Sequence, residues 1–228
     1  RASRFSIPAD NDNGDVPINT YKENFKGHIS FVKVGKEGEL DLAFQIVTPG
    51  VNFDLSHPGK KESHGWFFFS CYNTEQANTL LEVNASKNDK DFIMAVNWKK
   101  AEEYIKAGKG KKVPANYMHN TWDENTQTAK SETKTEVLIL DASELKDICY
   151  MIPCPKSPHG CDIDPTGEYI VGSGKLAALI PVFSFTKLKS AIAKKQFDGE
   201  YAGIPVIKYE AALHGEVQKP GLGPLHTE

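Results

Sequence analysis

Two histidines stand in sequence contexts that favour ligand binding. His159 lies in Pro158-His-Gly160, where the proline restricts the backbone on one side and the glycine frees it on the other, so we expect this histidine on a stiff loop. His226 lies near the end of the chain, in Gly-Pro-Leu-His-Thr. Imidazole nitrogens bind zinc, copper, iron and nickel, but two histidines do not complete a metal site. From the residues alone, each is either a metal ligand or a hydrogen-bonded loop histidine.

A second set of candidate ligands carries oxygen atoms. The segment Tyr72-Asn-Thr-Glu75 is followed by Asp89 and Asp91, and all of these lie in a predicted connection between two strands. Calcium binds carboxylate and backbone oxygens from irregular loops in a flexible coordination shell. The alternative is a solvated loop whose carboxylates cap backbone groups, and the residues alone leave both interpretations open.

The other chemical motifs in the sequence are weak. Gly172-Ser-Gly-Lys175 resembles the end of a phosphate-binding loop, but Leu176 follows where serine or threonine is required. The spacing of Cys149, Cys154 and Cys161 does not match a zinc site, so we expect buried free thiols or one disulfide. The sequence shows no Ser/His/Asp or Cys/His arrangement typical of nucleophilic catalysis.

The composition is that of a globular protein. The 228 residues are 39% hydrophobic and 25% charged, with a net charge of -3, so nucleic acid is not an expected partner. No apolar run approaches the roughly 20 residues of a membrane-spanning helix, so no membrane span is predicted. The chain shows no signal peptide and no initiator methionine, and it stops just after His226. We expect it to be an internal piece of a longer protein.

Hydrophobic patterning predicts mainly strands. The predicted strands are 27–34, 40–47, 65–71, 92–97, 136–140, 169–171 and 179–185, with short strands around 204–209. The run 65–71, GWFFFSC, is nearly continuous and predicts a strand buried on both faces. Helices are predicted at 98–107 and 188–195. We expect irregular structure at 1–26 and at 49–63, which contains Asp54, and a polar, partly disordered surface insertion at 108–135.

The sequence also contains an internal echo. The segment 64–70, HGWFFFS, resembles 166–172, TGEYIVG, and each is followed by a further strand and a lysine-rich helix. β-Propeller blades typically repeat a unit of a glycine turn, an apolar strand, a loop and a second strand. We therefore predict an all-β fold, a partial β-propeller of four-stranded blades with short helices between strands. A two-domain α/β fold is the weaker alternative because βαβ alternation is not sustained.

Several segments together resemble nitrous oxide reductase, a periplasmic copper enzyme. They are SRFSIP, LAFQIVTPGVNFD, FFFSCYNTE, NDKDFIMAVN, IPCPKSPHGC, DPTGEYIVGSGKL and GLGPLHT, in the family's order and rough spacing. The resemblance implies that residues 1–228 are an internal fragment of the family's N-terminal seven-bladed β-propeller domain. The insertion at 108–135 and a longer region at 186–220 suggest a divergent branch. The C-terminal cupredoxin domain, with its dinuclear copper centre, is absent from this sequence.

The resemblance implies a copper site at the two histidines. In the family, seven histidines hold a tetranuclear copper-sulfide centre that reduces nitrous oxide to dinitrogen and water, and the motif match carries His159 and His226 onto two of them. Asp54 matches an aspartate near that centre, and we expect its carboxylate to accept the second N–H of a ligand imidazole. The remaining ligands lie outside this sequence, so the fragment alone is expected to be inactive.

The resemblance also implies a structural calcium site. Tyr72, Glu75 and Asp91 match its side-chain ligands, with a backbone oxygen near Ala85. The sequence departs from the common pattern at Ser157, where an asparagine usually contributes, so either the serine oxygen or a water molecule takes that place.

The family's partners are nitrous oxide and a c-type cytochrome or cupredoxin electron donor, and its members are periplasmic homodimers. An alternative from a different class is a non-enzymatic periplasmic β-propeller that binds a partner or a small ligand and lacks copper. Paired histidines upstream and a cysteine-rich cupredoxin domain downstream would separate the two.

Overall fold

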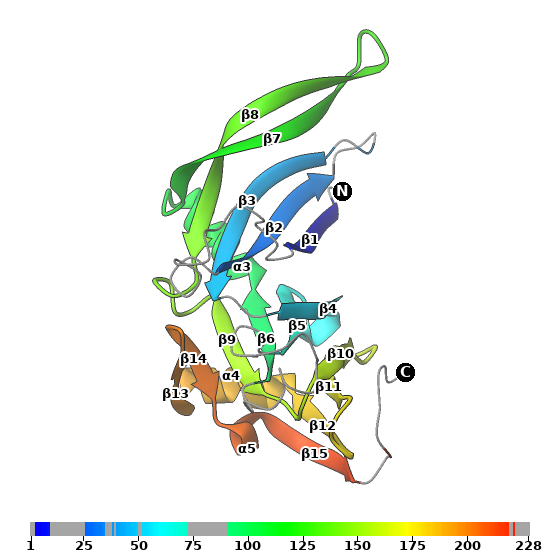
Figure 1. Cartoon of the computed structure of the whole chain (residues 1–228), viewed down its shortest axis with the longest axis vertical. Helices are drawn as coiled ribbons and strands as arrows, with labels where there is room; N and C mark the ends of the chain where they lie inside the picture. The colour runs from blue at the N-terminus through cyan, green and yellow to red at the C-terminus, as the bar shows by residue number, and fades with distance from the viewer. Residues whose placement is uncertain are drawn as a thin grey trace, which may run out of the picture.

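The chain folds mainly into β-strands, as predicted. The computed structural model describes residues 3–9, 26–34, 38, 40–49, 52–72, 91–218 and 221, and only the backbone at 3–9, 26, 49, 52, 72, 116–122 and 129. In Figure 1 the first sheet lies at the top, the second in the middle and the third at the bottom, and the first two each combine strands from separate parts of the chain. Their strand orders are β1-β2-β3-β8-β7, β13-β14-β9-β6-β5-β4 and β10-β11-β12-β15.

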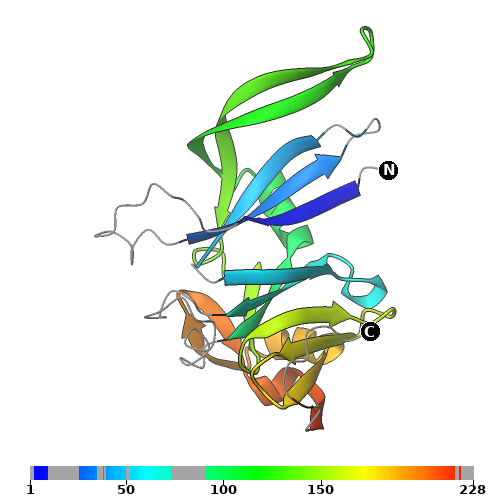
Figure 2. The same cartoon turned by 45° about the vertical axis from the view of Figure 1, so that its right-hand side comes forward.

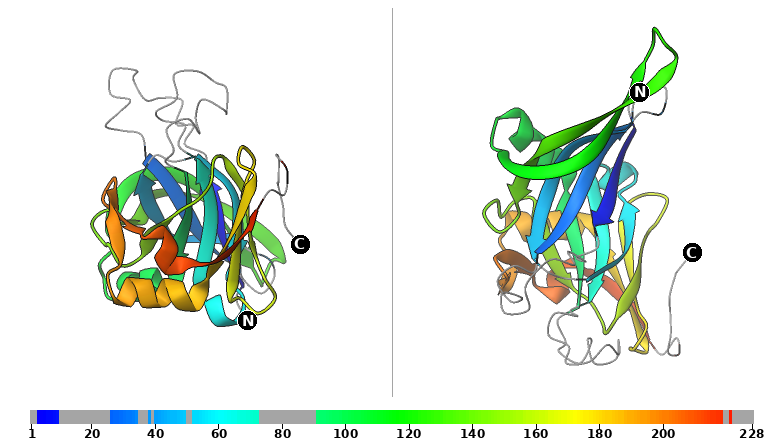
Figure 3. Two further views of the ribbon diagram at one scale, coloured as in Figure 1. Left: turned by 90° about the horizontal axis from the view of Figure 1, so that it is seen from below. Right: turned by 45° about the horizontal axis from the view of Figure 1, so that its top comes forward.

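The first sheet comes from the N-terminal half of the chain and one long hairpin. Its strands are β1 (Ser3–Ala9), β2 (Lys26–Val34), β3 (Leu40–Pro49), β7 (Lys111–Asp123) and β8 (Thr128–Asp141). β1, β2 and β3 are antiparallel neighbours, whereas β8 pairs in parallel with β3. The tip of the β7–β8 hairpin extends away from the rest of the described chain (Figure 3).

The second sheet lies in the middle of the molecule. Its strands are β4 (Asn52–Pro58), β5 (Trp66–Tyr72), β6 (Phe92–Asn97), β9 (Cys149–Pro153), β13 (Phe197–Tyr201) and β14 (Ile204–Ile207). The first four of these are antiparallel neighbours in the order β4-β5-β6-β9. β14 pairs in parallel with β9, so it extends the sheet beyond its fourth strand.

The third sheet has four antiparallel strands, of which the first three are consecutive in the chain. Its strands are β10 (Pro158–Ile163), β11 (Tyr169–Gly174), β12 (Leu179–Ser184) and β15 (Leu213–Gln218). Figure 2 shows β10 and β11 alongside β4 and β5 of the second sheet. The predicted four-stranded sheet size is correct here and wrong for the other two sheets. Those two are larger because β8 and β14 each add in parallel to a neighbouring sheet.

The second and third sheets repeat one arrangement of elements. Each has three consecutive strands, then a nine-residue helix, then a hairpin, then the fourth strand of the same sheet. The second strand of the hairpin pairs in parallel with the preceding sheet, β8 with β3 and β14 with β9. This repeat includes the two segments that echo each other in the sequence, which form the strands β5 and β11.

The two helices of the repeat begin in the same way. α3 (Trp98–Lys106) follows Asn97, whose side chain accepts the backbone N–H of Lys100, and α4 (Phe185–Ala193) follows Ser184, which accepts that of Lys187. Such side-chain caps satisfy a backbone donor at the first turn of a helix. The short helices η2 (Lys61–Ser63) and α5 (Tyr209–Ala212) occupy connections.

The middle sheet is buried on both faces, as the continuous run 65–71 predicts. Phe69, Met94 and Met151 face one hydrophobic core, shared with β2 and β3. Phe68 and Ile93, on the opposite face, belong to a second core with β11, β12 and α4. Successive strand residues point to opposite faces, so one run of phenylalanines fills both cores.

The structure corrects several predicted loops. Residues 49–63 are not wholly irregular, because Asp54 lies within the strand β4. His159 likewise lies in the strand β10 and not on a loop. The insertion at 108–135 contains most of the β7–β8 hairpin, which the sequence did not predict, and 1–26 contains β1. In the described segments, none of the helices combines the length and the apolar character that a membrane crossing requires.

Candidate functional site

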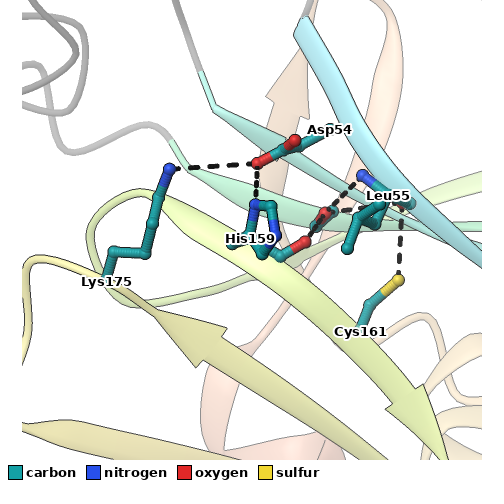
Figure 4. Close-up of polar contacts among 6 residues, drawn as sticks. Asp54, Leu55, His159, Cys161 and Lys175 are labelled. Atoms are coloured by element: carbon teal, nitrogen blue, oxygen red, sulfur yellow. Dashed lines mark hydrogen bonds and ion pairs between the residues drawn. The ribbon is translucent and has the colours of Figure 1, made fainter. Parts of the chain in front are cut away.

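The side chains of Asp54 and His159 meet where the second and third sheets lie side by side. Asp54 lies on β4, an edge strand of the second sheet, and His159 lies on β10, an edge strand of the third. The Nδ1 atom of His159 is 2.6 Å from Oδ2 of Asp54, and the two side chains are 25% and 23% exposed (Figure 4). The structure therefore joins two residues that the sequence analysis named for one site.

Both residues lie at irregularities in strand pairing. In β10, Pro158 pairs with Gly174 and Gly160 pairs with Ser173, so His159 is an extra residue on its strand. In β4, the pairing shifts between Phe53 and Ser56, the interval that contains Asp54. A β-bulge of this kind turns a side chain away from the regular alternation of the strand. Two neighbouring bulges thus direct Asp54 and His159 at each other.

Ser70 on β5 connects the two irregular strands. Its hydroxyl accepts a hydrogen bond from the backbone N–H of Leu55 at 3.0 Å and donates one to the backbone carbonyl of His159 at 2.6 Å. The Ser70 residue is completely buried. Ser70 was not predicted as a site residue from the sequence. The available signal was a single hydroxyl within a run of aromatic residues predicted to be buried.

Lys175 adds a positive charge beside the pair. Its Nζ lies 4.0 Å from the same Oδ2 of Asp54, and its side chain is 19% exposed (Figure 4). Its backbone N–H donates to the carbonyl of Ser157, which ties the end of β11 to the start of β10. From the sequence, Lys175 stood out only as part of a segment that resembles a phosphate-binding loop and does not match its pattern.

The geometry sets the tautomer of His159. A carboxylate only accepts hydrogen bonds, so the Nδ1 of His159 carries a proton and donates a hydrogen bond to Asp54. The neutral ring then has its lone pair on Nε2, and a lone pair on that nitrogen is what a metal ion binds. A carboxylate that orients an imidazole through its second nitrogen is the usual support of a metal-ligating histidine. The pair therefore has the chemistry of one histidine ligand and its supporting group, which suits copper among other metals.

Two of the expected calcium-site residues also lie together. The backbone N–H of Ser157 donates to Oδ2 of Asp91 at 2.8 Å, and both residues are buried. The backbone carbonyl of Asp91 accepts the N–H of Cys154 at 3.0 Å. Ser157 has a φ of +55°, a left-handed conformation that is uncommon for residues other than glycine. Asp91 therefore shapes the connection between β9 and β10, just before His159.

The remaining predicted site residues are outside this geometry. Glu75, Ala85 and His226 lie outside the described residues, and only the backbone of Tyr72 is described. Within the described parts of the chain, no group of three or more His, Cys, Asp or Glu residues is arranged to hold a metal ion. Of the residues expected at the copper site, the described chain contains Asp54 and His159, and of those expected at the calcium site it contains the side chains of Asp91 and Ser157.

The four cysteines are free thiols, one of the two alternatives left open by the sequence. Cys71, Cys149 and Cys161 are buried, and Cys154 is half-buried. Burial raises the pKa of the Cys161 thiol to about 12, and it also raises the pKa of Cys71, Cys149 and Cys154. Buried, protonated thiols are poor metal ligands and poor nucleophiles, so these cysteines belong to the packing between the sheets.

The chain is distantly related to nitrous-oxide reductase. The curated nitrous-oxide reductase of Pseudomonas fluorescens is 26% identical over 232 residues, which cover 99% of this chain and 30% of that protein. The nitrous-oxide reductase of Stutzerimonas stutzeri is 28% identical over 192 residues, which cover 82% of this chain and 25% of that protein. The alignments thus span at most 30% of the length of these relatives.

Other comparisons add little. No protein-family model matches the chain. A chain of Kuenenia stuttgartiensis hydrazine synthase superposes with a TM-score of 0.48 at 11% identity, covering 89% of this chain and 46% of that chain.

Proposed function

We propose that the chain is the central part of the N-terminal β-propeller domain of a nitrous-oxide reductase. Two observations support this: the distant relationship covers almost the whole chain, and the second and third sheets repeat one arrangement of strands, helix and hairpin. Repeated sheets that lie side by side, each starting from an edge strand, are what successive propeller blades require.

The Asp54–His159 hydrogen bond is the observation that carries the proposal. In this assignment, His159 is a ligand of a tetranuclear copper-sulfide centre, and Asp54 holds its ring in the tautomer that offers Nε2. His226 is a second ligand, and the other ligands come from segments beyond this sequence. When bound, such a centre supplies the electrons that reduce nitrous oxide to dinitrogen and water.

A calcium site completes the proposal. Tyr72, Glu75 and Asp91 are the proposed side-chain ligands, with a backbone oxygen near Ala85. Ser157 is the proposed remaining position, and the contact that supports it is the hydrogen bond from its backbone N–H to Oδ2 of Asp91. Calcium accepts changes in the number and kind of its oxygen ligands, which allows serine or water at this position.

The whole protein is proposed to be a periplasmic homodimer. Its electrons come from a c-type cytochrome or a cupredoxin, through a dinuclear copper centre in a C-terminal cupredoxin domain. This chain alone is proposed to be inactive because it lacks most of the copper ligands.

Elemental analysis of the protein, prepared at its full natural length, tests the proposal. We expect copper and calcium together, and consumption of nitrous oxide in the presence of a reduced one-electron donor. Calcium without copper in a protein matured with a copper supply would contradict the enzymatic assignment. It would favour a non-enzymatic β-propeller that binds a partner or a small ligand.

A further inference from the structure

Ser70 lies at a point where β5 contacts both irregular strands through a single side chain. The backbone N–H of Leu55, the residue after Asp54, donates to the Ser70 hydroxyl, and this hydroxyl donates to the carbonyl of His159 itself. β-Bulges interrupt the regular ladder of backbone hydrogen bonds, so groups at a bulge need other partners. One hydroxyl supplies such a partner on each side of the Asp54–His159 contact.

The surroundings of Ser70 show that its hydroxyl has a specific use. Ser70 is completely buried, and the three residues that precede it in β5 are phenylalanines. Burying a hydroxyl lowers the stability of the fold unless the hydroxyl is hydrogen-bonded. The Ser70 hydroxyl both accepts and donates a hydrogen bond. In the second copy of the sequence echo, Gly172 takes the place of Ser70, and a Cβ there would lie 2.7 Å from the Sγ atom of Cys154. The hydroxyl is therefore a feature of this junction and not of the repeat.

We propose that Ser70 is a positioning residue that fixes the backbones of Asp54 and His159 so that their side chains meet. The hydroxyl holds Leu55 and His159 at a set separation, and the two bulges then point the carboxylate and the imidazole at each other. An effect of Ser70 on copper binding rests on the proposed function. The consequence for the Asp54–His159 contact does not, because that contact exists within the described part of this chain.

The first test reads the His159 ring directly in metal-free protein at its full natural length. The ring is observed by ¹⁵N–¹H NMR of histidine-labelled protein, with His159→Gln used to assign the signals. Ser70→Thr and Ser70→Val introduce side chains of the same shape, so the difference between them isolates the hydroxyl from any overpacking. We expect the downfield Nδ1–H signal of the hydrogen bond to Asp54 in the wild type and in Ser70→Thr, and its loss in Ser70→Val and Ser70→Ala.

A matched control separates positioning from stability. Ser63 is also completely buried, but its hydroxyl bonds with Lys60 in its own turn. Ser63→Ala should lower the unfolding midpoint as Ser70→Ala does, while the His159 signal stays at its wild-type position. A wild-type His159 signal in Ser70→Ala or in Ser70→Val would overturn the positioning role.

The second test measures copper. If the proposed function holds, Ser70→Val should bind copper about 10–100-fold more weakly than Ser70→Thr, the range found when the support of a metal ligand is lost. Wild-type protein without copper would refute the proposed function and leave the NMR test of Ser70 intact. An altered His159 signal combined with undiminished copper binding would refute the link between Ser70 and the metal.

Discussion

The His159 imidazole donates its Nδ1–H to the Asp54 carboxylate at 2.6 Å, although 105 residues separate them in the chain. The contact crosses from the edge strand of one sheet to the edge strand of the next. It is made by two side chains that strand irregularities turn out of their regular alternation. Neither residue reaches the other through local sequence, so the arrangement of the sheets creates the pair.

Asp54→Ala should weaken copper binding by the full-length protein about 10–100-fold, because the His159 ring then loses the group that holds its tautomer and direction. The measurement is copper bound per chain across a range of free copper concentrations. Asp198→Ala is the matched control, since Asp198 is an exposed carboxylate on β13 of the same sheet. Equal copper binding in the two variants would contradict the supporting role of Asp54.

The contact between the second and third sheets includes a close approach of two turns. Gly167 has a φ of +78°, and a Cβ there would lie 2.0 Å from the backbone oxygen of Lys60. Gly199 has a φ of +77°, and a Cβ there would meet no atom of the described chain within 4 Å. Both substitutions to alanine carry the cost of a left-handed conformation, about 1 kcal/mol.

Only Gly167→Ala also forces the two turns apart. We therefore expect it to lower the free energy of unfolding by about 1–3 kcal/mol more than Gly199→Ala does. Denaturant unfolding of both variants measures the difference. Equal losses would mean that the two turns are not in contact in solution.

The turn that follows β10 should make stability depend on acidic pH. Burial opposes ionisation of Asp164, but hydrogen bonds from the Thr166 hydroxyl and from the backbone of Thr166 and Tyr169 outweigh it, so the pKa of Asp164 lies below its ordinary value. A lowered pKa stabilises the fold above the ordinary value of about 3.9, and this contribution is lost as the pH falls through the lower, folded value.

Asp164→Asn should therefore flatten the fall in unfolding free energy below about pH 4. Thr166→Val removes one donor and keeps the carboxylate, so its slope should lie between those of the wild type and Asp164→Asn. The check is a series of denaturant titrations across this range. Identical slopes in all three proteins would show that these hydrogen bonds do not lower the pKa of Asp164 in the folded protein.

The buried thiols should make stability depend on alkaline pH. Burial raises the pKa of Cys161 to about 12 and raises that of Cys71 and Cys149 as well. A raised thiol pKa contributes stability below the ordinary value of about 8.5, and this contribution is lost as the pH rises toward the folded value.

Two measurements follow for the native protein. Its thiols should react slowly with a disulfide reagent at neutral pH and fully after unfolding, with the half-buried Cys154 reacting first. The unfolding free energy should fall between about pH 9 and pH 11. Rapid reaction of several thiols in the native state would contradict their burial.

The sequence predicted the parts of the fold that depend on local pattern. Strand β6 was predicted from its apolar run, and helix α3 from its helical spacing and the glycine that follows it. The continuous run 65–71 predicted a strand buried on both faces, and Phe68 and Phe69 are both completely buried. Turn residues and apolar periodicity carry this information within a few residues of each element.

The sequence did not predict the irregular strands that make the candidate site. Prolines and glycines around Asp54 and His159 indicated loops, whereas the same residues lie in bulged edge strands β4 and β10. A bulge depends on pairing with a strand distant in sequence, so local propensity does not reveal it. The β7–β8 hairpin was missed because its polar residues do not show the alternation of a half-buried strand.

Some of the site residues were likewise predicted from the sequence, and others were recognised only in the structure. His159 was named first from its Pro-His-Gly context and Asp54 from a resemblance to a family, and the structure adds that the two are in contact. Ser70 was missed because the role of a serine inside an apolar strand depends on its hydrogen-bond partners, and these lie on two other strands. Lys175 was missed for the same reason, since its charge acts on Asp54 from the end of another sheet's strand.

Copper bound per chain, measured for the full-length wild type, His159→Ala and His214→Ala, tests the central claim most directly. His214 is an exposed histidine on β15 that packs against the Tyr169 ring, so it controls for the loss of an imidazole. The account predicts wild-type copper in His214→Ala and a large loss in His159→Ala. Undiminished copper in His159→Ala would contradict the assignment of this histidine, and with it the copper site proposed here.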